Sequence, residues 1–171
     1  MKSKHIIFIC LILLVLPAII GLFLRKDQIA SKTVVINQPY YQVMADITNY
    51  FECNTWRLNV DTMYMTGQVD GYETWIEKYN NGDSVLVKVL KLGENDLITS
   101  VFDQDGHERM RNFIFKDIDG ERTAFKMVEE VIITNPYLRF VALFYPFYNK
   151  NVNLYTKYLI EKYKNQPPAA F

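Results

Sequence analysis

The sequence predicts an α+β fold in which a curved antiparallel sheet of about six to seven strands wraps around a long carboxy-terminal helix, preceded by one transmembrane helix. Three observations lead to this prediction. An uncharged apolar stretch occupies residues 6–24, hairpin-type turns recur at short intervals through the middle of the chain, and a helical pattern with an apolar stripe closes it. A run of strands followed by a helix is typical of α+β domains.

Residues 6–24, IIFICLILLVLPAIIGLFL, predict the transmembrane helix, because about 20 apolar residues cross the hydrocarbon core of a bilayer. A cleaved signal peptide is the alternative, but it would have a shorter apolar stretch followed by a small-residue cleavage site. No such site follows Leu24. We therefore expect an uncleaved anchor with a short linker over residues 1–29, a domain over residues 30–165 and a tail over residues 166–171.

Charges on the two sides of the anchor nearly balance, so the positive-inside rule does not decide its orientation. A short tail before a signal-like apolar stretch usually stays in the cytoplasm. We therefore expect a single-pass membrane protein whose domain faces the extracytoplasmic side. The formal net charge of +0 gives no indication of a nucleic-acid partner.

The domain is expected to begin with a strand, because residues 33–36 are β-branched. Pro39 is preorganised for the first position of a helix over residues 40–47. A second helical turn should end near Trp56.

An antiparallel meander follows. Asn81-Gly82, Asp105-Gly106 and Asp119-Gly120 are strong hairpin signals between apolar or β-branched stretches. The strands they separate are expected at about residues 63–69, 72–79, 84–92, 97–103, 108–118 and 122–133.

The last part of the chain predicts an interrupted helical region, since Pro136 and Pro146 cannot lie inside a continuous helix. The long helix should start near Pro146. From there an apolar stripe recurs at steps of three and four, as on a helix that faces a sheet: Tyr148, Val152, Tyr155, Leu159 and Tyr163.

The opening of the domain, VVINQPYYQVMADITNYFECNTW, resembles the start of the START-like (SRPBCC) superfamily, in its polyketide cyclase/dehydrase-like branch. The matching positions are Val35, Ile36, Pro39, Val43, Ile47 and Trp56, and those of a second block are Gly71, Trp75 and Gly82. Gln38 and Met44 depart from the usual alanine and aromatic residue of the pattern. The resemblance covers about residues 30–164.

This resemblance implies a helix-grip fold with a deep apolar cavity between the sheet and the last helix. Members use that cavity for lipids, polyketides or other hydrophobic molecules, and many bacterial members also carry an amino-terminal membrane helix. The matching motifs are structural, so the resemblance does not indicate which ligand is bound.

Groups for catalysis or metal binding are sparse. His5 lies in the amino-terminal tail and His107 directly follows an Asp-Gly turn, so neither indicates a buried general base. The domain has one cysteine, Cys53, which is expected to fill space in the core. Cys10 lies in the anchor, so no disulfide between the two is expected. Metal-ligand spacing is missing, and we expect no metal and no cofactor.

Closely spaced like charges are more ambiguous. Glu73 and Glu77 would point to one strand face and could abstract a proton if burial raised their pKa. Such pairs on one strand face are more typical of a solvated face. Glu129 and Glu130 sit late in another strand, and no catalytic residue is assigned. Arg109 and Arg111 could hold an anionic head group, although solvated cross-strand pairing is the simpler interpretation.

Aromatic residues are the stronger indication of function, since they form 15% of the sequence and exceed what a core of this size needs. The candidates for lining a ligand cavity are Trp56, Tyr64, Trp75, Phe102, Phe113, Phe125 and Tyr155. Residues 135–148 are almost wholly apolar and aromatic, and we expect them to cover the cavity as a lid with partial membrane contact.

The sequence thus predicts a membrane-anchored domain that binds a hydrophobic small molecule or lipid. One alternative is an enzyme of the cyclase, dehydrase or hydrolase type that uses a cavity carboxylate or tyrosine. A non-catalytic interaction domain with a filled core is the second alternative.

Overall fold

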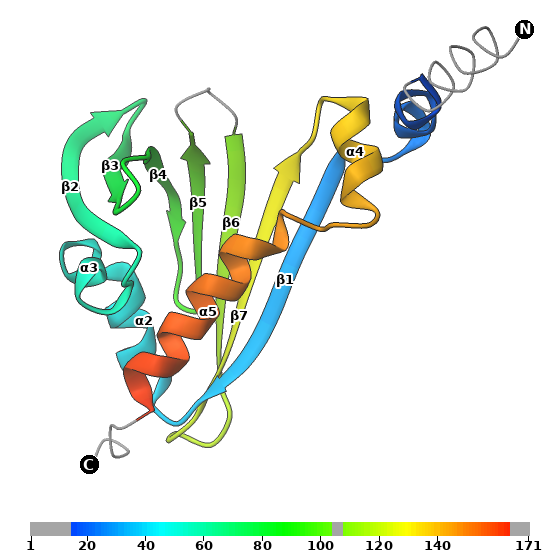
Figure 1. Ribbon diagram of the computed structural model, residues 1–171. Coiled ribbons are helices and arrows are strands. Elements are labelled where there is room, and N and C mark those ends of the chain that lie inside the picture. Colours follow the sequence, from blue (N-terminus) through cyan, green and yellow to red (C-terminus); the bar gives the residue numbers. More distant parts are fainter. Residues whose placement is uncertain (1–14, 104–107, 165–171) are drawn as a thin grey trace, which may run out of the picture.

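The computed structural model describes residues 15–103 and 108–164. One antiparallel sheet of seven strands, in the order β1-β7-β6-β5-β4-β3-β2, is crossed on one face by the long helix α5 (Asn149–Tyr163) (Figure 1). The strands are β1 (Asp27–Ile36), β2 (Val60–Val69), β3 (Tyr72–Tyr79), β4 (Ser84–Leu92), β5 (Asp96–Phe102), β6 (Glu108–Asp117) and β7 (Thr123–Ile132). The predicted α+β arrangement, with its antiparallel sheet and carboxy-terminal helix, is confirmed.

Strand β1 is longer than the β-branched residues 33–36 suggested. It pairs with β7 along its whole length, from Asp27 opposite Ile132 to Ile36 opposite Thr123. The additional residues include Asp27, Gln28, Ser31 and Lys32, whose polar side chains hide the strand from a search for apolar runs. The length of β1 is therefore set by its pairing with β7 and not by the intrinsic β-propensity of its residues.

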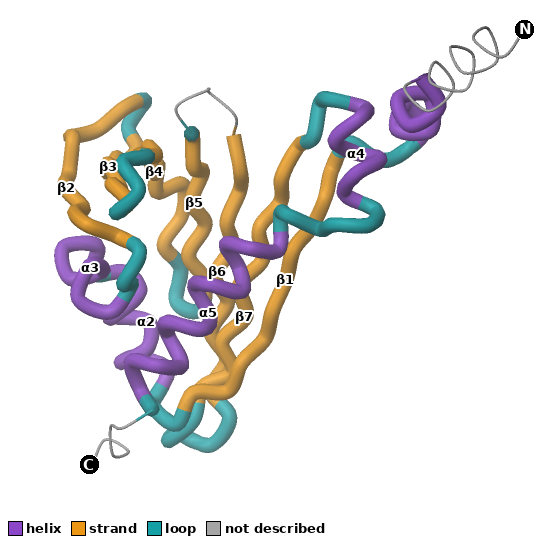
Figure 2. Tube along the Cα trace, in the orientation of Figure 1, coloured by secondary structure: helices purple, strands orange, loops and turns teal. Residues whose placement is uncertain are grey.

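Two short helices follow β1: α2 (Tyr40–Thr48) and, after a 3₁₀ turn (Tyr50–Glu52), α3 (Cys53–Trp56). They lie at the end of the sheet where β1 ends and α5 finishes (Figure 2). Val43 and Ile47 are the buried side chains of α2, at the helical spacing of four. The α2 helix therefore closes this end of the core.

The core lies between the sheet and these helices. Tyr155 of α5 stands at its centre, with ring centroids 5.3 Å from Trp56, 5.2 Å from Phe113 and 6.4 Å from Phe125. Contacts in this range each add about 0.5–1.5 kcal/mol to the gain from burial. These rings anchor α5 on the sheet.

At the opposite end of the sheet lie helix α4 (Pro136–Ala142) and the helical residues 15–23 (Figure 1). Pro136 begins α4 at its first turn, and the Asn135 side chain caps it by accepting from the backbone N–H groups of Tyr137, at 2.9 Å, and Leu138, at 3.4 Å. Residues 6–14 of the predicted anchor lie outside the described residues. Within the described ranges, no helix combines the length and apolarity needed to span a bilayer.

Candidate functional site

Two adjoining cavities open beneath the first turns of α5, at the end of the sheet where α4 lies. The larger, the polar lobe, has a volume of about 650 Å³ and includes Asn59, Tyr79, Asp83 and Lys150 in its lining. The second, the apolar lobe, has a volume of about 490 Å³, and half of its lining residues are apolar or aromatic: Val131, Ile132, Ile133, Leu138, Phe147 and Tyr148. Asp103, Arg109 and Asn151 line both lobes, so the two form one cleft.

The inner end of the cleft is nearly filled. A recess of about 20 Å³ remains between Arg57, Arg111 and Tyr155. A space of that size holds about one water molecule. The deep apolar cavity that the family resemblance implies is therefore occupied at this depth by the protein's own side chains, and the open space lies towards α4.

Charged side chains form the floor of the cleft. Glu77 of β3 is ion-paired with Arg57, which follows α3, and its second oxygen lies 3.5 Å from Nη1 of Arg111 on β6. Arg111 Nε donates to Glu129 Oε2 of β7 at 3.1 Å. Four elements of the fold thus meet in one buried network.

The network continues to the cleft at Glu129. Its Oε1 accepts a hydrogen bond from Asn151 Nδ2 of α5 at 3.1 Å and lies 3.7 Å from Nη1 of Arg109. Glu129 is completely buried, whereas Arg109 reaches the junction of the two lobes. Arg109 is therefore the member of the network that faces open space.

Burial and charge act in opposite directions on these groups. Burial by itself raises the pKa of Glu77, but the charges of Arg57 and Arg111 outweigh it and hold the pKa below the ordinary value of 4.5. Burial likewise opposes the charged form of Arg111, yet the charges of Glu129 and its neighbours raise the pKa of Arg111 well above its usual range. Glu77 and Arg111 are therefore ionised at neutral pH.

The solvated interpretation is wrong for Glu77 and Arg111, which are buried, and Glu129 is buried beside them. The alternation of side chains between the two faces of each strand could have predicted this burial. Arg111 shares a strand face with Phe113 and Phe115, and Glu129 shares one with Phe125 and Met127. Opposite charges on the core faces of paired strands can be buried together, and Arg111 lies directly opposite Glu129 in the register. By contrast, Glu130 is exposed.

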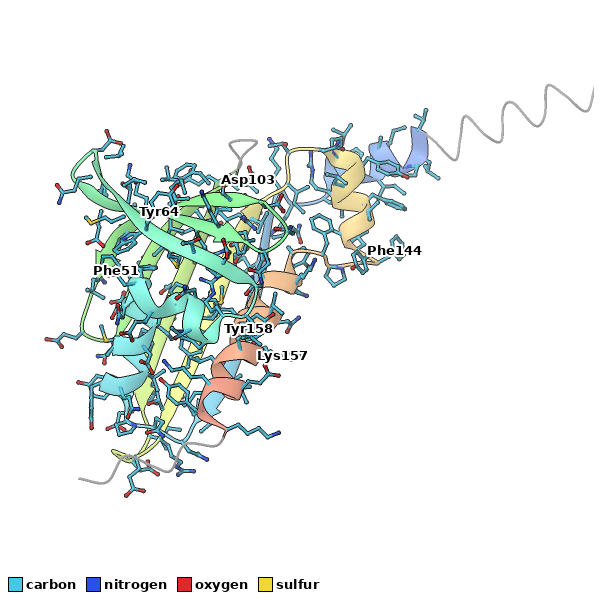
Figure 3. All side chains as sticks on the ribbon, turned by 60° about the vertical axis from the view of Figure 1, so that its left-hand side comes forward. Phe51, Tyr64, Asp103, Phe144, Lys157 and Tyr158 are labelled. Carbon is cyan, nitrogen blue, oxygen red and sulfur yellow. The ribbon has the colours of Figure 1, made fainter. Side chains whose placement is uncertain are left out.

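The seven aromatic candidates lie in different surroundings. Trp56, Phe113, Phe125 and Tyr155 come together in the core, and Tyr155 also lines the inner recess. Trp75 is buried elsewhere in the core, against Tyr50 and Phe51. Phe102 is half-buried at the end of β5. Tyr64 is exposed on β2 (Figure 3). The Lys78 ammonium lies over its ring, 5.5 Å from the ring centroid.

Other candidate groups are placed in part. Cys53 is buried, and burial raises the pKa of its thiol to about 11, as expected for a core residue. His5, Cys10 and His107 lie outside the described residues. Among the residues described, no group of three potential metal ligands comes together.

Some buried polar atoms at the cleft have no hydrogen-bond partner among the described residues. They include Nε of Arg57, Nε of Arg109 and Oδ1 of Asn59. Buried polar groups are normally satisfied by protein or by bound molecules. The cleft therefore offers both donors and acceptors to a polar ligand group or to water.

Solved structures resemble this chain over most of its length. A START superfamily protein from Mycobacterium smegmatis has a TM-score of 0.64 and 13% identity, over 81% of this chain and 99% of that one. The Zhui aromatase/cyclase from Streptomyces sp. R1128 has a TM-score of 0.63 and 9% identity, over 82% and 95%. The chain has the START-like helix-grip fold. The predicted superfamily fold is thus confirmed.

Function does not follow from this likeness. Truncated norcoclaurine synthase from Thalictrum flavum also resembles the chain, with a TM-score of 0.62 and 8% identity over 82% of this chain and 96% of that one. The sequence matches no family model and no curated protein. Because a cyclase and a synthase share this START-like fold, the function has to be argued from the cleft.

Proposed function

We propose that this chain is a membrane-anchored START-like domain that binds an amphipathic hydrophobic molecule or lipid in the cleft beneath α5, without transforming it. The observation that carries the proposal is the division of the cleft. An apolar lobe and a polar lobe share one wall, and Arg109 lies at their junction.

The apolar lobe suits the hydrocarbon or ring system of such a ligand. Its volume of about 490 Å³ falls within the usual range of about 300–1,000 Å³ for small-molecule sites. Aliphatic side chains from β7 and aromatic ones from the segment before α5 form its walls.

The junction suits an anionic or strongly polar group. Among the described residues, the guanidinium of Arg109 has one ion pair, at the long distance of 3.7 Å, and its buried Nε lacks a partner. The buried network beneath it contains the cations Arg57 and Arg111 and the anions Glu77 and Glu129. Those four charges balance, and Arg109 adds a further positive charge at the junction, where Asp103 also lines both lobes.

Binding is favoured over catalysis by the state of the buried carboxylates. A general base works best when its pKa lies near the working pH. The pKa of Glu77 is lowered, and its two oxygens face Arg57 and Arg111. This supports a structural role for Glu77, so an enzyme that uses it as a cavity carboxylate is the weaker candidate.

Membrane anchoring is part of the proposal and is supported by the uncharged residues 6–24. Alkaline carbonate extraction of membranes that contain the full chain tests it. The chain should stay in the membrane pellet, and a version without residues 1–24 should be released. Release of the full chain would refute the anchor.

Ligand binding is tested by lipid extraction and mass spectrometry of the full chain, purified gently in detergent. We expect a co-purifying amphiphile that is reduced by Arg109→Gln at the junction and by Phe147→Asp in the apolar lobe. Ile118→Asp on the exposed β6–β7 hairpin is the matched control. Equal lipid content in all four proteins would contradict the proposal.

A further inference from the structure

An apolar ridge projects from the α4 end of the domain. It consists of the helical residues 15–23 and residues 136–145, which include α4. Phe23 and Phe144 are 87% and 75% exposed. Phe144 projects away from the body of the domain (Figure 3). The other large apolar side chains exposed on the ridge are Val15, Leu16, Ile19, Ile20, Leu22, Tyr137, Leu138, Leu143 and Tyr145.

The two halves of the ridge are held together by a close backbone approach. A Cβ atom on Gly21 would lie 1.7 Å from the carbonyl oxygen of Pro136, so only glycine fits at this contact. This brings the start of α4 directly against the end of helix 15–23.

Arg139 is the one charged residue between positions 136 and 145, and it is turned inward. Its side chain is buried, with Nη1 donating to the carbonyl of Leu24 and Nη2 to the carbonyl of Thr134, both at 3.0 Å. Leu24 follows the last helical residue of 15–23, where helix carbonyls carry partial negative charge. Arg139 thus joins the halves while leaving the outer face of the ridge uncharged.

The position of the ridge on the anchor identifies what covers it. Gly21 and Phe23 lie near the carboxyl end of the uncharged residues 6–24. When those residues cross a bilayer, their carboxyl end lies where hydrocarbon meets the head groups. The contact between Gly21 and Pro136 holds α4 at the same depth. Tyrosine and other aromatic residues are favoured at that level.

We propose that residues 136–145 of the apolar ridge insert into the interfacial layer of the bilayer that holds the anchor. This inference rests on the proposed anchor. It also places the apolar lobe at the membrane surface, because Leu138 belongs to the ridge and lines that lobe. The cargo then exchanges with the bilayer directly, and its class is a membrane amphiphile.

The depth of Phe144 tests the proposal. The full chain, with Cys10→Ser and Phe144→Cys, is labelled with an environment-sensitive fluorophore and reconstituted into phosphatidylcholine vesicles that contain doxyl-labelled lipids. We expect a blue-shifted emission that loses most of its intensity with a doxyl group near the head groups and less with one deep in the acyl chain. The Ile118→Cys protein, labelled at the opposite end of the sheet, should keep its emission.

Cys53 is buried, so the Cys10→Ser protein without a further cysteine should take up no label and gives the background. Emission from position 144 that doxyl lipids do not quench would overturn the proposal. If that unquenched emission is also blue-shifted, a protein partner or a second copy of the chain covers the ridge instead of the bilayer. Lipid extraction from the same sample reports ligand binding, and carbonate extraction reports the anchor, so each can fail independently.

Discussion

Replacing Glu77 by glutamine should remove about 3–5 kcal/mol of folding free energy, the cost of breaking a buried ion pair. Glu77 is 1% exposed, and its partners Arg57 and Arg111 are 5% and 4% exposed, so water cannot replace the lost charge. In the variant, Arg111 still has Glu129 as an ion-pair partner, at 3.1 Å between Nε and Oε2, whereas Arg57 loses its ion pair with Glu77. The unpaired guanidinium of Arg57 therefore causes most of the loss.

The assay is thermal unfolding of the detergent-solubilised full chain, followed by circular dichroism. For a domain of about 150 residues, each kcal/mol corresponds to roughly 2–4 °C, so Tm should fall by about 6–20 °C. The matched control is Glu161→Gln, which removes an exposed α5 pair with Lys157 at 3.8 Å. That pair is worth about 0.3–0.5 kcal/mol.

A second variant separates the unpaired charge from a packing defect. Adding Arg57→Met to Glu77→Gln removes both partners and should restore part of the lost Tm, because replacing a whole buried pair costs less than breaking it. If Glu77→Gln changes Tm no more than Glu161→Gln does, the network is not a stabilising ion cluster. The proposed structural role of Glu77 would then be wrong.

Four further outcomes are expected. The stability difference between wild type and Glu77→Gln should shrink as pH falls below 4.5. The pKa of Glu77 is lower in the folded than in the unfolded protein, so the carboxylate stabilises the fold above the unfolded-state pKa, and this stabilisation is lost as the folded-state carboxylate is protonated. In the Cys10→Ser protein, a maleimide at pH 8 should modify Cys53 only after denaturation, because burial raises the pKa of this thiol to about 11. Arg109→Gln should weaken binding of an anionic amphiphile about 10-fold or more with a smaller fall in Tm than Glu77→Gln, whereas Arg122→Gln on the exposed hairpin should not weaken binding. Gly21→Leu should separate α4 from helix 15–23 and reduce doxyl quenching at position 144, unlike Ile20→Leu at its exposed neighbour.

Much of the fold could be predicted from local chemistry. The turns at Asn81-Gly82 and Asp119-Gly120 have glycines with φ of 91° and 85°, which side chains rarely adopt, so the hairpins were visible in the sequence. The apolar stripe of α5 was equally clear, with Val152, Tyr155 and Leu159 all buried. Features of this kind depend on residues close together in the chain.

The cleft could be predicted less well, because it depends on residues far apart. The charge of Arg111, taken alone, predicts an exposed side chain. Its burial can be predicted only when its strand face and its partner on β7 are both known. The aromatic excess likewise does not separate residues that fill the core, such as Phe113 and Phe125, from residues that line open space. Phe147 and Tyr148 line the apolar lobe, and neither was among the seven aromatic candidates for the cavity, although both lie in the predicted lid over residues 135–148.

The filled interior and the position of the ridge are two consequences of the same arrangement. The buried network and the aromatic cluster around Tyr155 occupy the space beneath the middle of α5. Open volume therefore remains at the end of the sheet where β7 leads into α4. Helix 15–23 contacts α4 at that same end, because β1 begins beside the last residues of β7. A ligand held in the cleft would thus lie next to the proposed anchor, and in the proposed arrangement hydrocarbon passes between bilayer and apolar lobe without crossing water.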